Sequence, residues 1–224
     1  AFWSVYLDPL FSLLRKDGIG CHIGGIFMGA VGYADDLILL APSRAAAQKM
    51  LSRCERFAND HNILFSTDPD PVKSKTKAIY VTGPKGRDLP NPASLQLCGR
   101  ALPWVTRADH LGHALNEDGT MQRDATQKRA QFIDVSVKIQ ESFSFAHPEE
   151  QLQAVEKYCT SVYGSNLYDF TSKEFGMICS AWKTNVKLAW GVHRGCRTYI
   201  LQQVLAPNVI PLRVNLLLRF RTFF

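Results

Sequence analysis

The chain has 224 residues, 46% of them hydrophobic and 21% charged, and a formal net charge of +6. These values are typical of a globular protein with its own core, arranged as one large domain or two small ones. No apolar run approaches the length of a membrane span and no signal peptide is recognisable, so we expect neither a membrane protein nor a secreted one.

Six cysteines are scattered along the chain without a Cys-x-x-Cys pair. This spacing favours reduced thiols in a nuclear or cytoplasmic chain over a disulfide framework. Cys21 adjoins His22, and His193 stands three residues before Cys196, but neither has a second pair at zinc-finger spacing. We therefore expect no zinc site.

Residues 2–16 are predicted to be helical, because apolar residues recur there at helical spacing. Pro9 suits the first turn of a helix capped by Asp8, or else a kink. Capping explains an aspartate before a proline, so we do not count Asp8 as a metal ligand.

Residues 27–40 carry two adjacent aspartates between apolar runs rich in strand-forming residues. The pattern predicts two short antiparallel strands joined by a turn, with Gly29 and Gly32 allowing close approach of other chain segments. Successive strand residues point to opposite faces, so one of Asp35 and Asp36 is expected to bind a cation while the other assists. Carboxylate oxygens suit Mg²⁺. The alternative is a turn with two solvated aspartates.

Ser43 is expected to cap the next helix, whose apolar stripe runs through residues 50–58 and packs on the sheet. Strands are predicted at residues 63–67 and 78–82. The loop between them contains prolines and ends in three alternating lysines, at Lys73, Lys75 and Lys77. A solvated basic loop is the alternative interpretation of these lysines.

Short strands are predicted at residues 94–97, 102–105 and 110–115. From about residue 122 the period becomes helical, which places a domain boundary between residues 120 and 121. The predicted helices include one marked by Ala130, Ile133 and Val137, one starting at Pro148, and residues 173–190, 197–205 and 211–224. Residues 1–120 carry 13 Lys+Arg and 12 Asp+Glu, whereas residues 121–224 carry 13 and 8, an excess that is consistent with a phosphate-backbone partner.

The segment Tyr33-Ala34-Asp35-Asp36 in this apolar setting resembles the catalytic hairpin of reverse transcriptases. The longer sequence, from Asp8-Pro9-Leu10-Phe11 through Leu37, resembles the enzymes of non-long-terminal-repeat (LINE-type) retrotransposons. The resemblance implies an α+β fold: the second half of a polymerase palm, an antiparallel sheet with packed helices, over residues 1–120. An all-helical thumb over residues 121–224 would follow it.

The resemblance also implies roles for individual residues. Asp35 and Asp36 would be catalytic and would hold two Mg²⁺ ions, or Mn²⁺ in their place. A lysine near the incoming triphosphate aligns with Lys75, with Lys73 as the alternative, and would neutralise phosphate charge or protonate the leaving pyrophosphate. Nucleotide and primer contacts would come from Tyr33, Ala34, Lys73, Leu111 and Gly112, the last two in a hairpin that resembles the primer grip.

In the predicted thumb, basic residues near Trp182 and Trp190 suggest a nucleic-acid surface, formed by Lys183, Lys187, Arg194 and Arg197. Core packing is the favoured interpretation of both tryptophans. The implied partners are an RNA template, a DNA primer, a deoxynucleoside triphosphate, and the upstream fingers and palm of a parent polyprotein, without a membrane.

The resemblance thus implies a fragment of an RNA-directed DNA polymerase that joins nucleotides to a primer 3′-hydroxyl. The first catalytic aspartate of such enzymes would precede Ala1, so we expect the fragment to be inactive or nearly so by itself. One alternative is a non-enzymatic nucleic-acid-binding remnant of a retroelement. A nucleotide cyclase is a third, disfavoured by the primer-grip-like hairpin and the basic helical tail.

Overall fold

The computed structural model describes residues 2–68, 70, 73–82, 93–160, 162–193, 195–197, 204 and 207–221. The chain is divided into two compact units, Ala1–Ala108 (unit 1) and Asp109–Phe224 (unit 2). The described residues form helices and four two-stranded sheets, which confirms an α+β fold. None of the described helices is long and apolar enough to cross a membrane.

Unit 1 begins with helix α1 (Phe2–Asp17), which contains Pro9 in its interior. The proline ring removes one backbone donor there without ending the helix. The prediction that Asp8 caps a helix beginning at Pro9 is therefore wrong, because the helix begins several residues earlier. The prediction of a helix over residues 2–16 is confirmed, with Pro9 inside α1.

Helix α2 (Arg44–Asp60) begins as predicted, with the Ser43 side chain accepting a hydrogen bond from the Ala46 amide at 3.2 Å. Its predicted apolar stripe is confirmed, since its buried residues are Met50, Leu51, Cys54, Phe57 and Ala58. Part of this stripe packs with Leu10 and Leu14 of α1 in the first core cluster of the unit.

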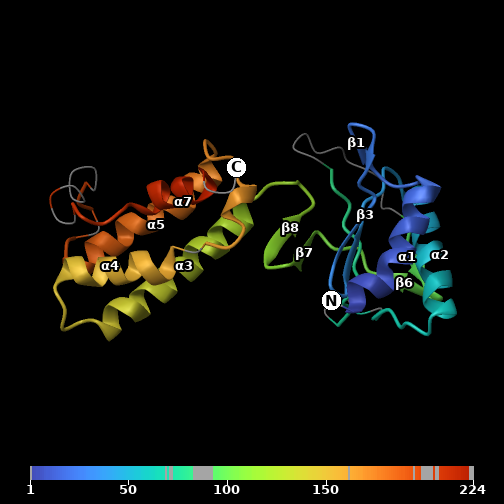
Figure 1. The fold of residues 1–224 in the computed structure, drawn as a ribbon, viewed down its shortest axis with the longest axis horizontal. Helices are drawn as coiled ribbons and strands as arrows, with labels where there is room; N and C mark the ends of the chain where they lie inside the picture. The colour runs from blue at the N-terminus through green and yellow to red at the C-terminus, as the bar shows by residue number, and fades with distance from the viewer. Residues whose placement is uncertain are drawn as a thin grey trace. The chain divides into compact units, whose positions relative to one another are not determined.

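Two hairpins lie between these helices in sequence, β1 (His22–Ile23) with β2 (Ile26–Phe27), and β3 (Ala30–Tyr33) with β4 (Asp36–Leu39). The second is the predicted aspartate hairpin, and its two strands pair with each other in the antiparallel direction. Figure 1 shows β3 alongside α1, with α2 behind them, within unit 1.

The segment after α2 differs from its predicted form. Residues 63–67 form no strand, and residues 78–82 contribute one parallel bridge, between Ala78 and Trp104. The predicted strand at 94–97 is confirmed as β5 (Leu95–Leu97), which pairs with β6 (Arg100–Leu102). Their inward leucines and Leu51 of α2 form the second core cluster of the unit.

Unit 2 contains the hairpin of β7 (Arg107–His110, which starts just before the division) and β8 (His113–Asn116). The prediction of a single strand over residues 110–115 is therefore wrong, because the chain turns at Leu111 and Gly112. Both turn residues have a left-handed backbone, with φ of 48° and 75°.

The described residues of unit 2 after β8 form the helices α3 (Gln122–Ser142), α4 (Pro148–Cys159), the short 3₁₀ helix η1 (Ser165–Leu167), α5 (Lys173–Ala189) and α7 (Leu212–Arg221). Helix α3 packs against α4 and α5 (Figure 1). Trp182 is buried in their shared core, as predicted, whereas Trp190 is half-buried at its border. The predicted helix at 197–205 lies mostly outside the described residues.

Candidate functional site

The aspartate hairpin is closed by a two-residue turn. Tyr33 pairs with Asp36, and Ala34 and Asp35 occupy the turn between them. Ala34 has φ of 53°, a left-handed conformation that glycine adopts more easily than alanine. Both aspartates are exposed, and neither forms an ion pair within the described part of the chain. The turn therefore presents two carboxylates to solvent from a strained backbone.

One face of the hairpin packs into unit 1. Ala30, Leu37 and Leu39 join the cluster around α1 and α2. Gly32 is on the same face as Leu37, its cross-strand partner, and a Cβ there would overlap the ring of Phe11 in α1. Close approach at Gly32, which the sequence predicted, is thus geometrically required.

Gly29 meets the backbone of a second segment. A Cβ on Gly29 would lie 2.6 Å from the Cα of Gly20, which is closer than real Cβ atoms approach. The Leu40 amide donates to the Gly29 carbonyl at 2.7 Å, which continues the pairing beyond the strands. These contacts fix the base of the hairpin, so its tip projects from an anchored support.

The opposite face of the hairpin is open. Tyr33 is 68% exposed and Val31 is 43% exposed, and the residues paired with them are Asp36 and Ile38. Because alternate strand residues share a face, Asp36 lies on the open face beside Tyr33. Asp35 lies in the turn itself. The expectation that the two carboxylates are not equivalent agrees with this geometry.

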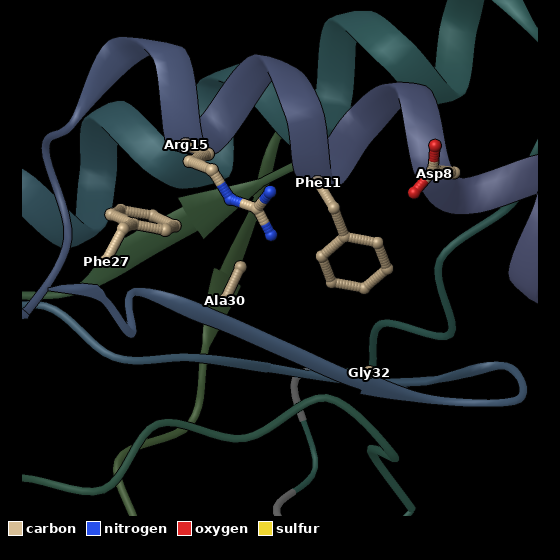
Figure 2. A pocket seen from close by; sticks show the side chains of 6 residues that line it. All are labelled: Asp8, Phe11, Arg15, Phe27, Ala30 and Gly32. Atoms are coloured by element: carbon tan, nitrogen blue, oxygen red, sulfur yellow. The ribbon is translucent and has the colours of Figure 1, made fainter.

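A shallow hollow of about 210 Å³ lies between α1 and the hairpin, on the face opposite Asp36. Its lining is Asp8, Phe11, Arg15, Phe27, Ala30 and Gly32. Figure 2 shows the Phe11 ring reaching from α1 toward the strand that carries Gly32. The hollow contains neither of the two predicted metal-binding aspartates.

The predicted phosphate-binding lysines flank a buried serine. Ser74 is 2% exposed, and its hydroxyl donates to the Thr76 carbonyl at 2.5 Å. Lys73 and Lys75, on either side, are exposed and form no ion pair with a described residue. The Ser74 hydroxyl thus ties residues 74–76 together, and the Lys73 and Lys75 side chains on either side are exposed to solvent.

In unit 2, the predicted primer-contacting residues Leu111 and Gly112 form the turn between β7 and β8. The Gly112 carbonyl accepts a hydrogen bond from Lys128 Nζ at 3.1 Å. Gly112 is exposed and Leu111 is half-buried. This turn belongs to unit 2, whereas Asp35, Asp36 and the lysine loop belong to unit 1.

A buried carboxylate below this turn was not predicted from the sequence. Asp124 is 1% exposed and accepts hydrogen bonds from the Ala114 amide at 3.0 Å, from the Tyr168 hydroxyl and from His113 Nδ1 at 3.3 Å. The Lys128 ammonium is 3.7 Å away. Burial favours a higher pKa for Asp124, but these donors and the lysine charge lower its pKa below the ordinary value. Burial and Asp124 raise the pKa of Tyr168.

The described positions of the basic residues predicted to bind nucleic acid do not establish one continuous surface. Lys183 is exposed and Lys187 half-buried on α5, four residues apart and thus on one side of the helix. Arg197 is exposed, and Arg194 lies outside the described residues. With the division at Ala108, residues 1–108 carry 13 Lys+Arg and 9 Asp+Glu, and residues 109–224 carry 13 and 11. The positive excess therefore does not concentrate in unit 2.

The hairpin tip offers carboxylate oxygens, which are the ligand type that Mg²⁺ takes. Mg²⁺ is commonly held by one or two carboxylates together with water and substrate phosphates. Asp35 and Asp36 supply two such carboxylates. Across the described part of the chain, no group of three or more His, Cys, Asp or Glu side chains could enclose a metal ion.

Comparison of the chain with protein-family models, curated proteins and solved structures found no match.

Proposed function

We propose that the chain is part of an RNA-directed DNA polymerase of the non-long-terminal-repeat retrotransposon type. The observation that carries the proposal is the hairpin tip, where Asp35 and Asp36 are exposed on a support anchored at Gly29 and Gly32. Strained backbone conformations such as that of Ala34 persist where the surrounding structure over-determines them, often at functional sites.

The proposal gives the site residues of unit 1 specific roles. Asp36, beside Tyr33 on the open face, and Asp35, in the turn, bind divalent cations through their carboxylates. When bound, two Mg²⁺ ions neutralise phosphate charge and favour in-line attack by a primer 3′-hydroxyl. Lys75 or Lys73 places an ammonium group against the triphosphate, where it offsets negative charge as pyrophosphate leaves.

Unit 2 contributes binding to the primer–template duplex in this proposal. The Leu111–Gly112 turn exposes backbone that can approach a nucleic-acid strand closely, because Gly112 has no side chain. Lys183, Lys187 and Arg197 add charge for phosphate contacts, which predicts salt-dependent binding.

By itself, the chain is proposed to bind primer–template without extending it. Two-metal nucleotidyl transfer needs carboxylates beyond the adjacent pair, and no group of three or more metal-binding side chains occurs within the described residues. The same observation favours the second candidate, a non-enzymatic nucleic-acid-binding remnant. The two candidates differ in whether binding responds to Asp35 and Asp36.

The test uses a labelled RNA template annealed to a DNA primer, with dNTP present, and follows both binding and primer extension with and without Mg²⁺. We expect salt-sensitive binding that Mg²⁺ strengthens, without extension. The double variant Asp35→Asn/Asp36→Asn is expected to lose the Mg²⁺ effect. Asp134→Asn is the matched control, because Asp134 is an exposed aspartate on α3 with its own lysine partner.

Each outcome separates the candidates. Binding that is unchanged by Mg²⁺ and equal in wild type and the double variant would favour the non-enzymatic remnant. Absence of binding would overturn both. Extension that the double substitution abolishes would establish the polymerase activity and overturn only the proposed inactivity of the chain.

A further inference from the structure

Tyr163 is an exposed aromatic residue beside the β7–β8 turn, and nothing in the sequence marked it. It is 65% exposed. A Cβ built on Gly112 would lie 3.4 Å from Tyr163 Cε1, so the ring rests against the turn backbone. The following residue, Gly164, has φ of 67°, and a Cβ there would overlap the His113 ring. The chain at Tyr163 is therefore packed directly onto the hairpin.

Two side chains lie against the Tyr163 ring. The His113 ring centroid is 5.4 Å from that of Tyr163, with the planes inclined by 34°. Lys128 Nζ lies 5.6 Å from the Tyr163 centroid, within range of a cation–π interaction. The ring is thus exposed but held in position.

The support below the ring is itself buried and fixed. Lys128 is 6% exposed, and both Lys128 and His113 lie against Asp124. Lys128 also donates to the Gly112 carbonyl, so one side chain links the turn, the ring and the buried carboxylate. A side chain ordered in this way loses little entropy when it binds a ligand.

We infer that Tyr163 is a stacking platform for a nucleobase of the primer strand at the Leu111–Gly112 turn. Aromatic side chains beside positive charge are the usual means of binding bases without sequence preference, because every base has a flat face. The inference rests on the proposed function, which brings a primer to this turn, and it adds a binding residue to it.

Tyr158 provides a matched control within the same unit. It is 63% exposed, and Lys157 Nζ also lies 5.6 Å from its ring centroid. It lies on α4, and its lysine is its exposed neighbour in sequence instead of a buried residue tied to Asp124. Tyr158 therefore matches Tyr163 in exposure and in distance to a cation, but it lacks the position beside the turn and the buried support below the ring.

The experiment uses the full chain and a DNA primer with 2-aminopurine at its 3′ end, annealed to an RNA template that carries a separate fluorophore. Anisotropy of the fluorophore gives the Kd, and 2-aminopurine emission reports stacking. We expect wild-type protein to change the emission on binding. Tyr163→Ala should raise the Kd about 5- to 150-fold and remove the emission change. Tyr163→Phe and Tyr158→Ala should behave as wild type.

Tyr163→Leu guards against misfolding, since it keeps apolar bulk while it removes the ring, and Tyr163→Phe accounts for the hydroxyl. Tyr163→Leu should also lose the emission change. Wild-type binding with equal Kd and emission for Tyr163→Ala and Tyr158→Ala would overturn the inference and leave the proposed function standing. Retention of the emission change in Tyr163→Leu would likewise overturn the inference alone. Failure of wild-type protein to bind the primer–template would overturn both.

Discussion

The two units treat their aspartates in opposite ways. Asp124 in unit 2 is 1% exposed and is surrounded by donors from Ala114, Tyr168 and His113. Asp35 and Asp36 in unit 1 are exposed and have no ion-pair partner among the described residues. A carboxylate whose lone pairs are already used stabilises the fold. One that faces solvent from an anchored turn is available to an external cation.

The sharpest way to break this comparison is to remove each carboxylate in turn. Asp124→Ala should lower the free energy of unfolding by about 3–5 kcal/mol, because it leaves Lys128 buried without its counter-charge. Asp35→Ala and the exposed control Asp134→Ala should each change it by about 0.5 kcal/mol or less. Urea unfolding followed by tryptophan fluorescence and circular dichroism measures the difference. Equal effects at Asp124 and Asp134 would contradict the assigned role of the buried carboxylate.

The pH dependence of stability also tests the role of the buried Asp124. The pKa of Asp124 is lowered in the folded chain, so its stabilising contribution is present above the unfolded pKa of about 4 and is lost as the pH falls through the folded value. Stability of the wild type should therefore decline on acidification, and the decline should be shallower in Asp124→Asn. Urea midpoints between pH 7 and pH 3 provide the measurement. Identical slopes for the two proteins would exclude Asp124 as the titrating group.

Gly29 tests whether the hairpin is anchored at its base. Gly29→Ala should lower the free energy of unfolding by about 1–3 kcal/mol, because the new methyl group meets the backbone at Gly20. Gly176→Ala is the control of opposite sign, since a Cβ there meets nothing within 4 Å and alanine favours helix α5 by up to about 1 kcal/mol. Thermal unfolding of both variants decides the point. Tolerance of alanine at Gly29 would mean that the hairpin base is loosely held.

The smallest expected effect concerns the turn itself. Ala34→Gly should raise the free energy of unfolding by about 0.5–1 kcal/mol, because glycine relieves the left-handed strain at φ of 53° but adds freedom to the unfolded chain. Chemical denaturation with replicate curves resolves a change of this size. A loss of stability would show that the Ala34 methyl group makes a contact that outweighs the strain.

The features predicted correctly from the sequence are those with a local cause. The apolar stripe of α2 repeats at helical spacing, and apolar runs on both sides of a polar turn indicate the β3–β4 hairpin. The turn at Leu111–Gly112 was missed because an apolar residue with positive φ gives no turn signal. The capping role of Asp8 was predicted wrongly because proline usually marks a first turn, whereas Pro9 lies inside α1.

The Asp124 network was beyond local pattern reasoning for a different reason. Its hydrogen bonds join residues 10 and 44 positions away in sequence, and only packing of β8, α3 and the segment before α5 brings them together. Tyr163 gave no signal either, because its significance lies in contact with Gly112 and His113. In contrast, Asp35 and Asp36 carry their chemistry within one turn, so the sequence alone identified them as candidates.

The central claim, that Asp35 and Asp36 bind a divalent cation together with a nucleotide phosphate, is tested most directly by electron paramagnetic resonance of Mn²⁺. Free Mn²⁺ is titrated with the chain in the presence of a deoxynucleoside triphosphate. We predict that wild-type protein and Asp134→Asn lower the free Mn²⁺ signal below that given by nucleotide alone, and that Asp35→Asn/Asp36→Asn does not. Equal signals for wild type and the double variant would contradict the claim.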